Sequence, residues 1–164
     1  MRHLRILLLI IVAALSACNN HSEEDLYTIL KIDSELEPHS LTLDWGALTP
    51  EERHQYPRDG FLINSIDDFP IDSRYDVADL KLMDIDYAKY SLLVNFCLIP
   101  GLIQGHNLYW YYDNSEKRFF FQANFNIIDN EDPGQNPDTF TYYRAAILVK
   151  KIPSDSKVEY TYSN

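Results

Sequence analysis

Histidine and cysteine, the side chains that most often do chemistry, are few in this chain and stand apart from one another. No two histidines form the HxxxH pair typical of a zinc site. The histidines beyond the first residues are His21, His39, His54 and His106. Cys97 is a lone thiol within an apolar run, a setting that disfavours the reactive thiolate. We therefore expect surface histidines and a buried, structural cysteine.

Carboxylates are numerous, and two short segments could offer oxygen ligands to calcium: residues 84–86 and residues 129–132. The second segment lacks the order of an EF-hand loop, because Phe140 holds the place of the bidentate glutamate. Solvated surface acid is the competing explanation, and we predict no metal and no cofactor.

Several familiar catalytic motifs are missing from the sequence. It has no G-x-S-x-G element, no P-loop and no G-x-G-x-x-G after a strand. A hydrolase that uses two carboxylates is the catalytic alternative, but nothing in the sequence selects one pair. We predict that the protein is not an enzyme.

The composition is that of one globular domain. The chain has 164 residues, of which 46% are hydrophobic and 13% aromatic. Its 25 acidic and 14 basic side chains give a formal charge of −11. Binding a polyanion needs a surface rich in lysine and arginine, so the charge argues against a nucleic-acid partner.

The first eighteen residues have the pattern of a secretory signal. A short cationic start is followed by ten apolar residues, 6–15, and then by Ser16, Ala17 and Cys18. Ten residues rise only about 15 Å as a helix, too little to span a bilayer. Residues 15–18 resemble the bacterial lipobox, which implies cleavage after residue 17 and a lipid on Cys18. We predict a signal peptide at 1–17 and contact with a membrane through this lipid.

Residues 18–25 form an acidic tether behind the predicted anchor. Ser22, Glu23, Glu24 and Asp25 resemble the export signal that sends Bacteroidetes-type lipoproteins to the outer face of the outer membrane. A plain solvated tether would look the same, and it would leave a periplasm-facing protein. We expect an outer-membrane lipoprotein that is displayed on the cell surface.

Residues 26–164 are predicted to form a single β-rich domain. Alternating or apolar segments bounded by turn residues predict strands. These segments are 26–32, 40–45, 60–64, 90–98, 107–112, 118–128, 139–152 and 157–162. Thr49, Pro50 and Glu52 form a capping box that starts a short helix, and Ser65 offers a second helix start. We expect a mainly β (α+β) fold, an antiparallel β-sandwich or a strongly curved sheet with one or two short helices.

Aromatic residues crowd the predicted hairpin of residues 107–128 and the strand after it. Phe119, Phe121 and Phe125 alternate with polar residues and should face the core. The segment 108–112 is aromatic on both faces, which leaves rings for either a second packed layer or a binding surface. Such a surface suits a partner protein or a sugar ring. The candidate binding residues are Tyr109, Trp110, Tyr111, Tyr142 and Tyr143.

Several segments between residues 62 and 158 are similar to those of small Bacteroidetes-type lipoproteins. They are residues 63–69 (Ile-Asn-Ser-Ile-Asp-Asp-Phe), 86–94 (Asp-Tyr-Ala-Lys-Tyr-Ser-Leu-Leu-Val), 145–152 and 157–160. The Asp-Tyr-x-Lys-Tyr block also resembles, more distantly, a β-rich protease-complex-associated domain. That domain carries a Gly-Gly-Tyr element, whereas this chain has Pro100 and Gly101 there. The resemblance implies fold and location, and no functional residue carries over.

The sequence predicts a membrane-anchored, surface-exposed lipoprotein that acts by binding rather than by catalysis. Its partner would be a protein or another ligand. A glycan-binding accessory protein that uses an aromatic platform is the alternative.

Overall fold

The computed structural model describes residues 26–56, 58–70, 77–128 and 139–164. The predicted signal peptide (1–17), the lipidation residue Cys18, the tether (18–25) and the acidic segment 129–132 lie outside these residues. Among the described residues, no helix has the length and apolar character needed to cross a bilayer.

Strands dominate the described residues, and the helical elements are short. The elements, in chain order, are β1 (Tyr27–Ile29), β2 (Ser34–Glu35), β3 (His39–Asp44), α2 (Pro50–Arg53), β4 (Gly60–Ile63), the 3₁₀ helix η2 (Ile66–Asp68), α3 (Ala78–Lys81), β5 (Tyr90–Pro100), β6 (Leu102–Asp113), β7 (Arg118–Ile128), β8 (Thr139–Lys150) and β9 (Val158–Ser163).

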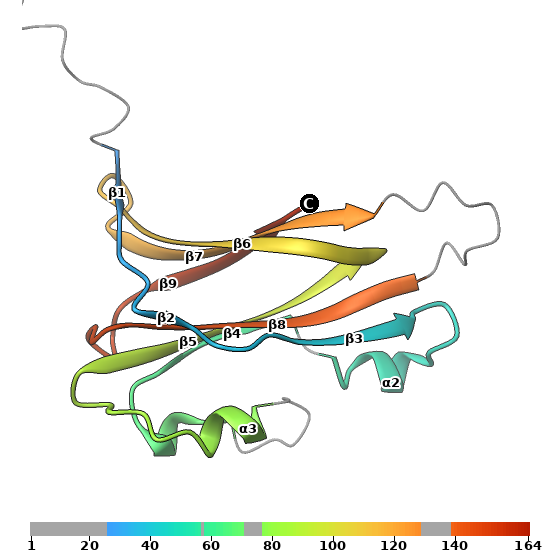
Figure 1. Ribbon diagram of the computed structural model, residues 1–164, viewed down its shortest axis with the longest axis horizontal. Coiled ribbons are helices and arrows are strands. Elements are labelled where there is room, and N and C mark those ends of the chain that lie inside the picture. The colour runs from blue at the N-terminus through green and yellow to red at the C-terminus, as the bar shows by residue number, and fades with distance from the viewer. Residues whose placement is uncertain (1–25, 57, 71–76, 129–138) are drawn as a thin grey trace, which may run out of the picture.

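The strands form two sheets that face each other as a sandwich (Figure 1). Sheet A has the order β1-β6-β7-β9, and sheet B has the order β2-β8-β5-β4. Strand β3 also pairs with β8, on the same side as β2. Helices α2 and α3 lie beyond sheet B, on the side away from sheet A (Figure 1). The expected fold class, a mainly β sandwich with short helices, is confirmed.

The central strands of sheet B, β5 and β8, are buried on both faces, and β5 shows why. Even-numbered residues of β5, such as Leu92 and Phe96, pack toward the helical layer together with Leu80 of α3. Odd-numbered residues, such as Leu93 and Cys97, pack toward sheet A. A strand that is covered on both faces needs a nearly continuous apolar sequence, which residues 90–99 supply except at Ser91 and Asn95.

The β6–β7 hairpin anchors the core between the sheets. Trp110 stacks on Phe119 with ring centroids 5.0 Å apart, and Phe121 is fully buried. Phe125 meets Tyr143 of sheet B edge to face at 5.0 Å. The predicted inward face of this hairpin is therefore confirmed.

The capping box predicted for α2 is present in full. The backbone N–H of Glu52 donates to Oγ1 of Thr49 (3.2 Å), and the N–H of Thr49 donates to Oε2 of Glu52 (2.7 Å). The second of these bonds lowers the pKa of Glu52 below its usual value. The start at Ser65 gives only the 3₁₀ helix η2, in which the Ser65 side chain makes no cap bond.

Three features of the topology differ from expectation. Strand β9 runs parallel to β7, whereas the sequence suggested antiparallel neighbours. Strand β6 begins at Leu102 rather than at residue 107, with a bulge between Ile103 and Gly105. Strand β2 is only two residues long, too short to leave a recognisable pattern of alternation.

Candidate binding surface on sheet A

The structure separates the five predicted binding residues into two groups. Tyr109 and Tyr111 lie on the outer face of sheet A, and Tyr109 is 45% exposed. Trp110, on the opposite face of β6, is 3% exposed. Tyr142 and Tyr143 are 7% and 4% exposed, because both faces of sheet B are covered. The expectation of one surface containing all five residues is therefore corrected.

The outer face of sheet A carries a cluster of aromatic rings contributed by three strands. Tyr111 of β6 stacks on Phe120 of β7 with centroids 5.1 Å apart and ring planes within 2°. Tyr27 of β1 meets Tyr111 edge to face at 5.6 Å. We call Tyr27, Tyr109, Tyr111 and Phe120 the aromatic platform.

A shallow hollow of about 320 Å³ lies on this platform. It is lined by Tyr27, Tyr109 and Tyr111 together with the strongly exposed Ile29. Exposed aromatic rings around a hollow make this face a candidate binding surface. Sequence reasoning missed Tyr27, because β1 reaches the platform only through its pairing with β6.

Amide side chains from β7 form the polar border of the hollow. Nε2 of Gln122 donates to Oδ1 of Asn124 (2.9 Å), and Oγ of Ser163 donates to the same oxygen (2.8 Å). These bonds orient the Asn124 amide and leave its Nδ2 group, among the described residues, without a partner. The border thus offers a hydrogen-bond donor beside the rings.

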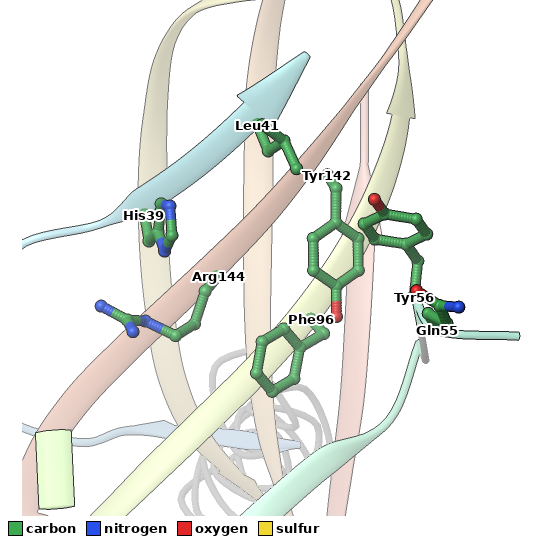
Figure 2. A pocket seen from close by; sticks show the side chains of 7 residues that line it. All are labelled: His39, Leu41, Gln55, Tyr56, Phe96, Tyr142 and Arg144. Carbon is green, nitrogen blue, oxygen red and sulfur yellow. The ribbon is translucent and has the colours of Figure 1, made fainter. Parts of the chain in front are cut away.

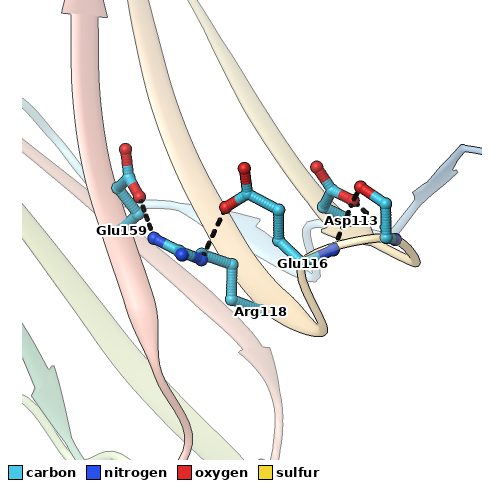
Figure 3. Close-up of polar contacts among 5 residues, drawn as sticks. Asp113, Glu116, Arg118 and Glu159 are labelled. Carbon is cyan, nitrogen blue, oxygen red and sulfur yellow. Dashed lines mark hydrogen bonds and ion pairs between the residues drawn. The ribbon is translucent and has the colours of Figure 1, made fainter.

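Charged groups hold the turn at one end of the platform (Figure 3). Oδ1 of Asp113 accepts from N and Oγ of Ser115 (2.7 and 2.6 Å) and from N of Glu116 (3.0 Å). These bonds, led by the Ser115 hydroxyl, lower the pKa of Asp113. Arg118 bridges Glu116 (2.8 Å) and Glu159 (2.7 Å), which joins β7 to β9.

Tyr111 keeps its proton on this surface. Partial burial raises the pKa of its hydroxyl, and the nearby Tyr27, Asp113 and Glu159 act in the same direction. A neutral phenol can both donate and accept a hydrogen bond. The platform therefore combines flat apolar rings with neutral polar groups.

Tyr142 lines a second, smaller cavity between sheet B and the segment after α2 (Figure 2). The cavity holds about 90 Å³, and its Tyr142 ring stacks on Phe96 and meets Tyr56 edge to face. Arg144 at its rim is held by Asp79 through bonds of 2.6 and 2.8 Å. This volume suits a few water molecules rather than a substrate.

Tyr143 belongs to a polar chain at the edge of the sandwich. Its hydroxyl lies 2.9 Å from Nδ1 of His106, and Nε2 of His106 lies 2.5 Å from Oε1 of Glu35. The arrangement of carboxylate, imidazole and hydroxyl resembles a nucleophile-activating relay in outline. Burial, however, raises the pKa of Tyr143 well above its usual value, so the hydroxyl stays protonated. His106 was expected as a surface histidine; its side chain is 21% exposed and has two partners that the sequence did not indicate.

The remaining candidates for chemistry do not form a reactive centre. Cys97 is fully buried, and burial raises the pKa of its thiol to about 12. In the part of the chain that the structure describes, no three histidine, cysteine or acidic side chains are placed to hold a metal ion.

Comparison with known proteins adds no relative: no protein-family model, no curated protein and no solved structure matches this chain. What the platform binds has to follow from its own chemistry.

Proposed function

We propose that this protein is a non-catalytic, lipid-anchored binding protein of the outer-membrane surface, and that the aromatic platform binds a glycan. The observation that carries the proposal is the placing of exposed tyrosines from two strands beside neutral amides, on the outer face of sheet A, which no other layer of the described residues covers (Figure 1).

The chemistry of a sugar ring fits this surface. One side of a pyranose presents C–H groups that pack on a flat ring, and its hydroxyls need donors and acceptors at the border. Tyr109 and Tyr27 supply the rings, and Gln122 and Asn124 supply the amides. Among the described residues, none that lines the hollow is charged, which favours a neutral saccharide.

The predicted anchor would keep this platform close to the membrane. Nine residues lead from Cys18 to Tyr27, the first residue of β1. A chain of that length extends at most about 30 Å. A lipid on Cys18 would therefore hold the platform within reach of glycans that belong to, or arrive at, the cell surface.

A partner protein is the second candidate, and Ile29 is the observation in its favour. This side chain is 86% exposed beside Tyr111 and offers apolar area that a sugar does not need. The described residues that line the hollow are also uncharged, as are the residues at the centre of many protein interfaces.

Affinity electrophoresis separates these two candidates. Residues 26–164 would be run through gels that contain a mannan, a xylan, an α-glucan or purified lipopolysaccharide. We expect retardation by at least one of them, reduced about tenfold in apparent affinity by Tyr109→Ala because one stacking ring is removed. The matched control is Leu82→Ala, an exposed apolar residue outside the platform.

Two outcomes would replace the glycan proposal. Migration unchanged in all four gels, together with capture of a protein from solubilised membranes that Ile29→Asp abolishes, would make the platform a protein interface. Equal loss of retardation in Tyr109→Ala and Leu82→Ala would remove the platform as the site. The anchor is tested separately by labelling cells with radioactive palmitate, where Cys18→Ser should abolish incorporation.

A further inference from the structure

One edge of sheet A is largely open. Strand β1 pairs only with Tyr111–Asp113 of β6, and the N–H of Leu30 donates to the carbonyl of Trp110 (2.8 Å). From Leu102 to Tyr109, β6 has β7 on one side and, among the described residues, no strand on the other. The chain leaves this edge because it crosses to sheet B, where β2 and β3 pair with β8.

The open edge presents a regular array of backbone groups that have no partner among the described residues. Alternate residues of a strand direct their N–H and C=O groups to the same side. His106 and Leu108 therefore direct theirs to the side on which Trp110 meets Leu30. Edge strands with free groups of this kind are templates for pairing with another chain.

A groove of about 420 Å³ runs beside this edge. Its floor is formed by Ser40 and Thr42 of β3, which stand opposite Tyr143 and Thr141 in the pairing of β3 with β8. Tyr143 packs toward sheet A, so Ser40 shares that face. Sheet B thus extends one strand further than sheet A here. The groove lies where a further strand of sheet A would pair with β6.

The groove is preorganised, and its edge strand has few of the features that normally prevent pairing with another chain. His106 forms the inner wall and is fixed by Tyr143 and Glu35. Natural edge strands are usually blunted by charged residues or proline. The segment 102–109 (Leu-Ile-Gln-Gly-His-Asn-Leu-Tyr) has neither, and its one irregularity is the bulge between Ile103 and Gly105.

We propose that this groove binds an extended peptide segment of another protein, which adds to β6 as a further strand of sheet A. Main-chain hydrogen bonds to His106 and Leu108 supply the affinity. Alternate peptide side chains face Ser40 and Thr42, which favours small or hydroxyl-bearing residues at those positions. This site is separate from the aromatic platform and does not depend on it.

A second copy of this chain does not fit the same place. In a symmetric pairing of two β6 edges, each copy would bring its own β8 and β3 beneath its β6. The overhanging β3 of the first copy already occupies that space. A single extended strand has no such second layer.

The test uses a nine-residue peptide of alternating serine and valine with a lysine at each end, added at millimolar concentration to residues 26–164. Amide hydrogen exchange, read by NMR, measures pairing at the edge. We expect exchange at the His106 and Leu108 amides to slow about tenfold with the peptide. The Asn107 amide, which faces β7, should change far less.

Two variants decide whether peptide binding in the groove causes the slower exchange. Ser40→Tyr fills the floor from an exposed position and should abolish the slowing. Ser34→Tyr, also exposed but on the opposite face of sheet B beside Leu148, should leave it intact. Slowing that persists in Ser40→Tyr, or no slowing in the unchanged protein, overturns the proposal. Dimerisation without peptide that Ser40→Tyr abolishes would also overturn it, because a second copy would then hold the edge.

Discussion

Sheets A and B use the same kinds of residues for different purposes. In sheet B, β5 and β8 are covered by the helical layer on one face and by sheet A on the other. In sheet A, β6 and β7 bury only one face and leave the other to solvent. An aromatic residue in the centre of sheet B is therefore part of the core whichever way its side chain points. In sheet A, the face of the strand on which the residue lies decides whether its side chain is buried or exposed.

Two tyrosine pairs illustrate the difference. Tyr142 and Tyr143 of β8 point to opposite faces, and both are buried. Tyr111 and Tyr112 of β6 also point to opposite faces, and Tyr111 reaches the platform while Tyr112 packs against Phe119. Position along the sequence does not distinguish these pairs, because the helical cover of sheet B comes from residues elsewhere in the chain.

The sharpest test of the difference between the buried and exposed faces of sheet A uses two neighbouring phenylalanines of β7. Phe121→Ala should lower the free energy of unfolding by about 3–5 kcal/mol, because it empties a fully buried site between the sheets. Phe120→Ala removes a partly exposed ring from the platform and should cost about 1 kcal/mol. Urea unfolding of both variants gives the two values. Similar losses would mean that the outer face of sheet A is covered as well.

The edge where β4 approaches β9 provides the next largest effect. A Cβ on Gly60 would lie 1.9 Å from Cγ of Tyr160, a ring atom too close to the backbone to swing away. Gly60→Ala should therefore cost about 3 kcal/mol through overpacking.

Gly105→Ala is the matched control, since its nearest neighbour would be 3.8 Å away. Both changes add one methyl group to a strand. Thermal unfolding of the two variants therefore compares the edge where β4 approaches β9 with the open edge of β6. Equal melting temperatures would show that sheets A and B are not tightly packed against each other at Gly60.

Local signals in the sequence predicted much of the fold. The capping box at Thr49, the apolar run of β5 and the alternation in β7 depend on residues close together in the chain, and all three were recognised. The parallel pairing of β9 and the partners of His106 depend on contacts across 37 residues or more. The platform was half predicted: Tyr109 and Tyr111 were identified, but Tyr27 joins them only through tertiary pairing.

Alkaline pH should destabilise the layer between the sheets. Burial raises the pKa of the Tyr143 and Tyr160 hydroxyls and raises that of the Cys97 thiol to about 12. The folded state therefore holds these protons at pH values where the unfolded chain has released them, so stability falls as the pH rises above about 9. We expect a loss of about 2 kcal/mol between pH 8 and pH 10.

Urea midpoints at the two pH values measure this loss. Cys97→Ala should reduce it by more than half, because the thiol has the lowest unfolded pKa of the three groups. An undiminished loss in Cys97→Ala would assign the alkaline effect to other groups. Leu82→Ala is the control, since it removes no titratable group and should leave the loss unchanged.

The smallest expected effect compares single hydroxyl groups in the two sheets. Tyr143→Phe removes the hydrogen bond to Nδ1 of His106 and should cost about 1 kcal/mol, because the partly buried ring nitrogen loses its partner. Tyr109→Phe removes an exposed hydroxyl and should stay within about 0.5 kcal/mol of the unchanged protein.

The ring nitrogens of His106 supply an independent readout by ¹⁵N NMR. Tyr143→Phe should alter the Nδ1 signal because Nδ1 loses its contact with the Tyr143 hydroxyl, while Tyr109→Phe should leave that signal in place. Equal stability losses with an unchanged His106 spectrum would mean that the buried tyrosine of sheet B is held by packing alone, and the inner wall of the groove would then lack the polar chain that fixes it.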